Sequence, residues 1–327
     1  MSNTYAPITF ADLESSGKDL QHRLNWSSVF VLPRWFTVWW QTFGKGSQQY
    51  LFEVRENRSV IGIAPLIVDK GKASFIGSAD VCDYMDFVIA PRREQAFFTA
   101  VLDKLKREGI KELFLESLRH DSMVMTCLTD LVKDKGYEVK VSRENVSLDL
   151  ELPSTWDAYL KTLSPKQRRE TGRRFRRLDE EGDINYRIVD DAKPEVLDIF
   201  FKLMRVSRKD KAAFLTPEME SFFRAVAKTM AEARMLRFGL LEISKRPVAA
   251  VMCFDYNDKV YLYNSGYDPE YGYISVGLLS KLLSIKDSIE RGKKVYDFLK
   301  GAEEYKYRLG GKEIPIYSCQ ITLEIRI

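Results

Sequence analysis

Hydrophobic and polar residues alternate along two neighbouring stretches in the first half of the chain, residues 51–55 and 59–68. A period of two is typical of β-strands that bury one face, and the Glu56-Asn57 pair between the stretches indicates a tight turn. The pattern therefore predicts a β-hairpin.

The second half contains a similar arrangement. Residues 235–243, 247–256 and 259–265 have the composition of strands, and Asn257-Asp258 joins the last two with residue types that favour a hairpin turn. We expect three consecutive strands here.

A helix, a glycine that ends it and a buried strand also occur once in each half. They are residues 94–108, Gly109 and 111–117 in the first half, and residues 275–291, Gly292 and 294–299 in the second. Duplication of a whole α/β domain explains this repeat best, with chance similarity of two simple patterns as the alternative. We expect a mixed α/β fold of two domains, residues 1–150 and 151–327, because one compact core rarely serves a chain of this length.

The remaining stretches add further elements. Strands are predicted at residues 85–90, 137–141, 146–152, 184–189 and 316–325. Helices are predicted at residues 29–40, 122–135, 154–163, 165–181, 194–208 and 217–233. The aromatic residues of the first of these helices either form core or line a sugar-binding groove.

Composition excludes several classes of protein. The chain has 45% hydrophobic and 30% charged residues and a net charge of +4, which is ordinary for a folded enzyme and does not by itself imply a nucleic-acid partner. The cysteines Cys82, Cys127, Cys253 and Cys319 stand singly, which suits a reducing compartment, and the two histidines lie far apart. Neither a metal site nor a Ser-His-Asp triad is expected. Residues 1–10 lack the pattern of a secretory signal and no stretch is long enough to span a bilayer, so we expect a cytoplasmic protein.

The stretch of residues 259–279 carries the most informative chemistry. A strand ends at Asn264-Ser265-Gly266, a loop follows, and a helix begins near Ser275-Val276-Gly277. A helix start of this kind presents free backbone N–H groups and the positive end of the helix dipole, which suits a pyrophosphate. The alternative is an ordinary helix capped by Ser275.

Several short motifs resemble those of a known family. The order of hairpin, strand, glycine-containing helix start and further strand resembles the core of the GNAT acyltransferases. The motifs are residues 83–87, 166–177, 179–182, 263–268, 275–279 and 296–301 with Tyr305-Lys306. Together they resemble a tandem-GNAT branch, the acetyltransferases associated with bacterial cellulose and exopolysaccharide biosynthesis, which is related to the Fem-type aminoacyl transferases. Residues 271–277 depart from the usual Arg/Gln-x-x-Gly-x-Gly/Ala loop.

This resemblance implies two GNAT-like domains in tandem, each a mixed, mostly antiparallel sheet flanked by helices. It implies transfer of an acyl group from acetyl-CoA or another acyl-CoA, without a metal, to an amine or hydroxyl acceptor that is small or polymeric, such as a cell-envelope or polysaccharide precursor. The donor would be held by the second domain, at Asn264, Ser265, Tyr271, Ser275, Val276 and Gly277.

A transfer of this kind needs a base for the acceptor and a group that stabilises negative charge. Asp86 is the preferred base and Asp83 the second candidate, with Tyr84 between them as a substrate contact; the alternative is that both carboxylates are structural. Lys306 would bind a phosphate or stabilise the oxyanion, unless it is a solvated loop lysine. Lys211 is a further candidate for substrate binding.

The helix at residues 165–181 begins with a strongly basic run, seven Lys and Arg side chains against Glu170 up to residue 177. Arg168 and Arg173 are its candidates for binding an anionic substrate, an anionic membrane surface or RNA, and the alternative is a solvated helix face. Two rivals to an acyl-CoA enzyme follow: a Fem-type transferase that uses aminoacyl-tRNA, and a non-catalytic protein that docks on an anionic surface through this helix.

Overall fold

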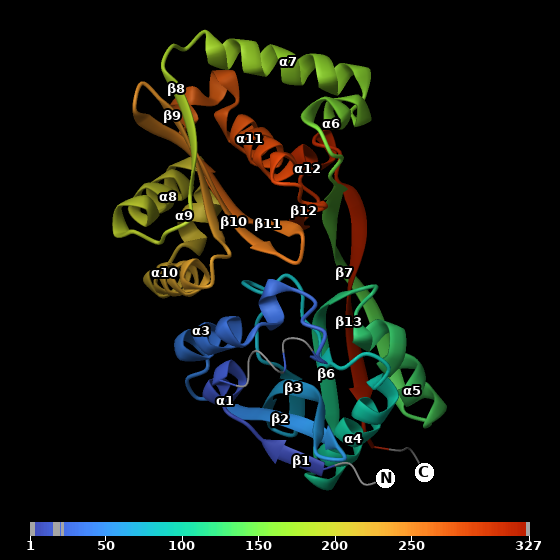
Figure 1. The fold of residues 1–327 in the computed structure, drawn as a ribbon. Helices are drawn as coiled ribbons and strands as arrows, with labels where there is room; N and C mark the ends of the chain where they lie inside the picture. Colours follow the sequence, from blue (N-terminus) through green and yellow to red (C-terminus); the bar gives the residue numbers. More distant parts are fainter. Residues whose placement is uncertain (1–3, 16–19, 21–22, 325–327) are drawn as a thin grey trace. The chain divides into compact units, whose positions relative to one another are not determined.

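The computed structural model describes residues 4–15, 20 and 23–324, and its ribbon is drawn in Figure 1. The chain forms two compact units, one of Met1–Val146 with Ile314–Ile327 and one of Ser147–Glu313. The predicted division at residue 150 differs from this in the last strand, β13 (Lys312–Thr322). Most of that strand belongs to the first unit, because residues 316–322 pair antiparallel with β6 (Glu112–Arg119).

The first unit is built on a mixed sheet. Its strand order is β1-β2-β3-β4-β6-β13, with β5 paired to β3. The other strands are β1 (Thr4–Pro7), β2 (Gln48–Glu56), β3 (Ser59–Asp69), β4 (Lys72–Phe75) and β5 (Val88–Ile89). The helices are α1 (Phe10–Ser15), α3 (Pro33–Phe43), α4 (Glu94–Arg107) and α5 (Thr129–Asp134), the last preceded by a π-helical turn at Val124–Leu128.

The aromatic residues near α3 form part of the core of this unit. Trp35 and Phe36 are fully buried, and the Trp35 indole donates to the sulfur of Cys82 over 3.2 Å. Phe30 is also fully buried and packs edge-on against Trp35. These side chains are therefore unavailable to line a sugar-binding groove.

The second unit contains six strands in the order β7-β12-β11-β10-β9-β8. They are β7 (Glu138–Glu151), which begins in the first unit, β8 (Ile184–Val189), β9 (Leu236–Ile243), β10 (Arg246–Tyr256), β11 (Lys259–Tyr267) and β12 (Val295–Lys300). Neighbouring strands are antiparallel except β11 and β12, which are parallel.

Helices cover both faces of the β9–β11 sheet. Figure 1 shows α8 (Pro194–Ser207) and α10 (Pro217–Glu232) on one face and α11 (Val276–Glu290) on the other. The others are α6 (Trp156–Thr162), α7 (Pro165–Asp179), α9 (Lys209–Phe214) and α12 (Glu304–Arg308). Proline opens α7, α8 and α10, as the sequence predicts, because its missing N–H is not needed in the first turn.

Both predicted hairpins are present. Asn257 and Asp258 join β10 to β11 with φ of 49° and 60°, the positive values of a two-residue turn whose twist matches that of the strands. In the first unit the turn is Asn57-Arg58, one residue later than predicted.

Other predictions differ from the structure. Residues 137–141 and 146–152 are not separate strands but one, β7, because strand pairing continues through the polar residues between them. The strand predicted at residues 85–90 is only two residues long, and the helix predicted at 122–135 starts as the π-helical turn. No helix in the described part of the chain is both long and apolar enough to cross a membrane.

Candidate functional site

The central feature of the second unit is the place where β11 and β12 separate. The two strands pair in parallel over only three positions, Lys259 to Tyr261 with Val295 to Asp297. Since β11 continues to Tyr267 and β12 to Lys300, their remaining lengths make no ladder with one another. A wedge between parallel strands leaves backbone groups of both edges available to a ligand.

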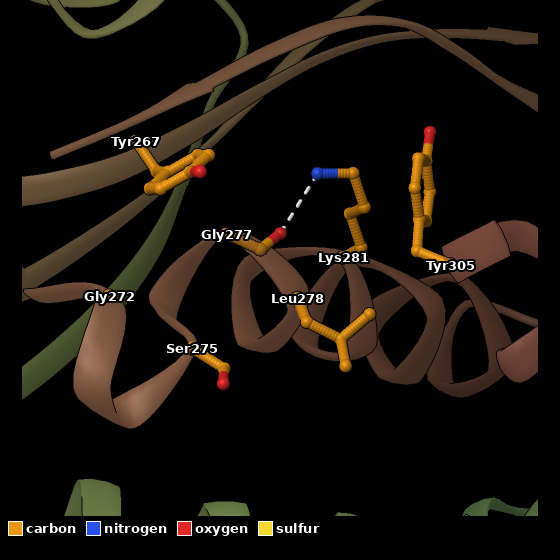
Figure 2. Close-up of a pocket in the computed structure, with 7 residues that line it drawn as sticks. All are labelled: Tyr267, Gly272, Ser275, Gly277, Leu278, Lys281 and Tyr305. Carbon is orange, nitrogen blue, oxygen red and sulfur yellow. Dashed lines mark hydrogen bonds between the residues drawn. The ribbon is translucent and has the colours of Figure 1, made fainter. Parts of the chain in front are cut away.

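A pocket lies beside this wedge, at the start of α11, with a volume of about 290 Å³. Figure 2 shows the residues that line it: Tyr267, Gly272, Ser275, Gly277, Leu278, Lys281 and Tyr305. They come from the end of β11, the loop after it, the first two turns of α11 and α12. The pocket therefore gathers what the sequence predicts for a donor site, the strand exit and the helix start.

The start of α11 is shaped to leave backbone donors free. Ser275 is the N-cap residue with φ of 63°, and its side chain makes no capping bond to the helix. Its carbonyl accepts the N–H groups of Leu278 and Leu279, at 2.9 and 3.0 Å. Helix geometry then leaves the N–H groups of Val276 and Gly277 without an intrahelical acceptor. These donors and the helix dipole would favour an anion here.

Gly277 is required by its neighbour Tyr267. A Cβ atom at residue 277 would lie 2.8 Å from the Tyr267 ring, closer than a carbon contact allows. The absence of a side chain at residue 277 therefore makes room for an aromatic wall of the pocket.

Two of the predicted donor residues, Ser275 and Gly277, line the pocket. Val276 is buried beneath them. Tyr271 instead lies under the guanidinium of Arg246, 5.5 Å from its ring centre. The other two, Asn264 and Ser265, belong to a separate cluster on β11.

That cluster is organised by Lys211 of α9. Its ammonium donates to the Asn264 Oδ1 atom over 2.9 Å and also to the Ser265 carbonyl. Burial, together with the nearby Arg208, lowers the pKa of Lys211 to about 8. The predicted residues Lys211, Asn264 and Ser265 are thus brought together, but they hydrogen-bond one another.

Lys281 was not predicted, and among the titratable side chains that line the pocket it is the buried one. It is only 6% exposed, and its Nζ atom donates to the Gly277 carbonyl over 2.9 Å. The same Nζ lies 4.9 Å from the centre of the Tyr305 ring. Burial lowers the pKa of Lys281 to about 7, and the positive charge of nearby Lys211 adds to the effect. The i,i+4 spacing from Gly277 was the signal that places both on one helix face.

The surroundings of Lys306 contradict the solvated alternative and favour a structural role. It is 2% exposed, so it is not a solvated loop lysine. Its ammonium donates to the carbonyls of Leu299, Lys300 and Gly301 at 3.0, 2.6 and 3.0 Å and pairs with Glu303 at 2.8 Å. A lysine has three N–H donors, so these acceptors already use them all. Lys306 therefore holds the exit of β12, where Leu299 has the unusual φ of 62°, instead of offering a phosphate or an oxyanion its hydrogen bonds.

Asp86 lies in the first unit and has the contacts of a helix cap. Its carboxylate accepts the N–H groups of Phe87, Met123 and Val124 at 2.9, 2.7 and 3.4 Å. The side chain is buried, and this burial raises its pKa to about 7. Both carboxylate oxygens accept hydrogen bonds from the turn that leads into the Val124–Leu128 segment. The geometry therefore favours the structural alternative over the role of a general base.

The other predicted residues of the first unit differ in burial. Tyr84 is 4% exposed and packs on Phe30, with the Arg119 guanidinium 5.0 Å from its ring centre, so it is a core residue instead of a substrate contact. Asp83 is half-buried in the segment between β4 and β5.

The two arginines predicted on α7 have different surroundings. Arg168 donates to the carbonyls of Leu160, Lys161 and Leu163 at 2.9, 3.1 and 3.3 Å. Its guanidinium group therefore caps the end of α6, and few of its N–H donors remain for an anionic ligand. Arg173 is exposed. It lines an open hollow of about 330 Å³ on the surface of α7, together with Lys166, Arg169, Glu170 and Arg176.

Comparison with known proteins identifies the second unit. Residues 165–307 match the family model of the acetyltransferase (GNAT) domain. That range runs from α7 into α12 and contains every residue that lines the pocket. No curated protein matches the chain in sequence.

Solved structures with the same fold cover nearly the whole chain. FemX matches with a TM-score of 0.65 and 13% identity, over 97% of this chain and 96% of its own. A tandem GNAT protein from the clavulanic acid biosynthesis pathway, solved without acetyl-CoA, matches at 0.52 and 12%, over 97% and 98%. The C-terminal domain of a putative lysylphosphatidylglycerol synthetase from Agrobacterium fabrum matches at 0.52 and 8%, over 84% and 83%.

At these identities the likeness concerns the fold. It extends over both units, whereas the family model covers only the second. Residues 165–307 are thus a GNAT acetyltransferase domain, in a chain that has the fold of tandem GNAT and Fem-type proteins.

Proposed function

We propose that this protein transfers an acyl group from an acyl-coenzyme A thioester to an amine or hydroxyl acceptor, and that the donor is held by the pocket at the start of α11. The observation that carries the proposal is the coincidence of three features within residues 165–307: the separation of β11 from β12, the free N–H groups of Val276 and Gly277, and the pocket between Tyr267 and Tyr305.

Each feature suits one part of the donor. A pyrophosphate is an anion that backbone N–H groups at a helix start bind well. A pantetheine arm carries amides, which can pair with the strand edge left open beyond Tyr261. The thioester would then lie toward Lys281 and Tyr305, where the wall of the pocket is most buried. From the resemblance of its motifs we further propose that the acceptor is a cell-envelope or polysaccharide precursor.

Calorimetric titration with coenzyme A and acetyl-CoA tests the donor. Wild-type protein should bind both, and Gly277→Val should lose binding because the new side chain meets the Tyr267 ring and fills the pocket. Gly172→Val is the matched control, since a Cβ atom at Gly172 meets nothing within 4 Å. A folded wild-type protein that binds neither ligand would contradict the proposal.

A second candidate donor, aminoacyl-tRNA, is favoured by one observation, the exposed basic hollow on α7. Lysine and arginine side chains that contact phosphates release counterions, so binding weakens as salt rises. Replacing Arg169, Arg173 and Arg176 with Gln should weaken the binding of bulk tRNA and reduce its salt slope by roughly 2–3, at about 0.7–0.9 for each lost phosphate contact.

Fluorescence anisotropy across a salt series measures both quantities. A charge-matched control replaces three exposed lysines elsewhere in the second unit, Lys202, Lys228 and Lys312. Equal slopes for the two triple variants would remove tRNA as a donor and leave α7 as a solvated helix.

A further inference from the structure

We propose that Lys281 is the general base of the transfer, taking up the proton that the acceptor loses as it attacks the acyl carbonyl. The inference rests on the proposed function, because it needs the acyl group to lie in the α11 pocket.

The position of Lys281 is the first argument. It stands on the second turn of α11, between Tyr267 and Tyr305 in the view of Figure 2, with its Nζ atom at the pocket. A hydrogen bond of 2.9 Å to the Gly277 carbonyl, drawn as the dashed line, holds the amine in place. The side chain is nine-tenths buried, so its orientation is fixed by packing instead of by water.

The second argument is the count of hydrogen-bonding groups. A neutral lysine amine has two N–H groups and one lone pair. The Gly277 carbonyl takes one N–H, which leaves the lone pair available to a proton. Lys306 differs because its three donors are used by carbonyls, and the ammonium of Lys211 is held by Asn264 and Ser265.

The charges around the amine favour its neutral form. Lys211 of α9 and Lys306 of α12 raise the local positive potential, while Glu303 opposes it. In the described part of the chain no carboxylate forms an ion pair with Lys281. The Tyr305 ring, 4.9 Å away, would stabilise the ammonium once it forms. With a pKa of about 7, the amine can both accept and return a proton near neutral pH.

The step balances as follows. The acceptor nitrogen or oxygen forms a bond to the acyl carbon, and its proton passes to the lone pair of Lys281 Nζ. The carbon–sulfur bond breaks and its electron pair stays on sulfur as the coenzyme A thiolate. The Lys281 ammonium then gives its proton to that thiolate or to water, which restores the neutral amine.

Competitive labelling tests the amine directly. Wild-type protein is treated with trace acetic anhydride between pH 5 and 10, and the labelling of each lysine is read by mass spectrometry. Lys281 should titrate near pH 7 and be protected by coenzyme A. Lys286, on the same helix with its side chain 43% exposed, is the control, and coenzyme A should leave its labelling unchanged. A Lys281 whose labelling shows no transition near pH 7, or that coenzyme A fails to protect, overturns the proposal.

A variant separates a base from a merely structural lysine. Lys281→Met keeps the length and the burial of the side chain but removes the lone pair. We expect unchanged coenzyme A affinity by calorimetry, whereas thiol release from acetyl-CoA with water as acceptor should fall about 10²–10⁴-fold and lose its acid limb near pH 7. Lys286→Met should leave both unchanged.

The outcomes distinguish this inference from the proposed function. Wild-type protein that does not bind coenzyme A refutes the donor site, and with it the role of Lys281. Wild-type protein that binds coenzyme A while Lys281→Met releases thiol at the wild-type rate refutes the role of Lys281 alone.

Discussion

Replacement of Lys306 by Met should destabilise the second unit instead of acting on donor binding. The ammonium is 2% exposed and satisfies the carbonyls of three consecutive residues at the exit of β12. Removing one partner of a buried charged cluster costs about 3–5 kcal/mol, because the groups left behind keep their desolvation penalty. Leu299, held at φ of 62° inside this turn, would also lose its support.

The size of the effect can be measured by calorimetry. A unit of this size loses roughly 2–4 °C in Tm for each kcal/mol, so a shift of about 10 °C is expected in the transition of the second unit. Hydrogen exchange should rise around residues 297–303, where the cluster holds the chain. The control is Lys312→Met, an exposed lysine of the same unit, which should change neither quantity.

One result would refute this reasoning. If Lys306→Met unfolds at the wild-type temperature with unchanged exchange at the β12 exit, the carbonyl contacts do not stabilise the fold. A stable variant with weakened coenzyme A binding would instead restore the phosphate role predicted from the sequence.

Three further changes test other parts of the structure. Gly266→Ala should destabilise the second unit by about 1–3 kcal/mol in urea unfolding, because a Cβ atom there would lie 2.4 Å from the Leu203 carbonyl carbon in α8. Gly272→Ala is the control and should show no such loss, since its Cβ atom meets nothing within 4 Å. Asp86→Asn should lower the stability of the first unit by about 1–3 kcal/mol, since an amide N–H would face backbone donors. A fall in the turnover of the folded enzyme without a loss of stability would instead support Asp86 as the general base. Between pH 7 and about 10 the unfolded chain holds a proton on Lys281 that the folded chain lacks. The free energy of unfolding of the wild type should therefore rise with pH relative to that of Lys281→Met, by up to roughly 4 kcal/mol. If the free energies of unfolding of the two proteins change with pH in parallel, the pKa of Lys281 is not lowered.

The parts of the fold that follow local rules are predictable from the sequence. Asn257-Asp258 adopts the turn its residue types favour, and the prolines of α7, α8 and α10 stand in their first turns. The strand β7 is different, since its polar middle resembles a turn, yet it is one continuous strand that lies between β13 and β12 in the sheet.

The chemistry of single lysines and carboxylates is harder to predict. Lys306 and Asp86 were singled out as reactive groups, but folding brings backbone carbonyls to one and backbone N–H groups to the other. For Asp86 the partners Met123 and Val124 lie 37 and 38 residues away, so they meet it only in the folded chain. For Lys306 the carbonyls lie five to seven residues away, but no residue pattern shows that the chain turns back on itself after β12. Lys281 was overlooked for the converse reason: a lysine on a helix is usually solvated, and only its burial shows otherwise.

The return of β13 to the first unit has a consequence for the order in which the protein is made. Residues 316–322 complete the pairing of β6, yet they leave the ribosome after the whole second unit has been synthesised. Until then one side of β6 presents an open strand edge, which is a site for pairing with other chains. The first unit should therefore reach its final form only after the second unit has been synthesised, because its fully folded state depends on β13.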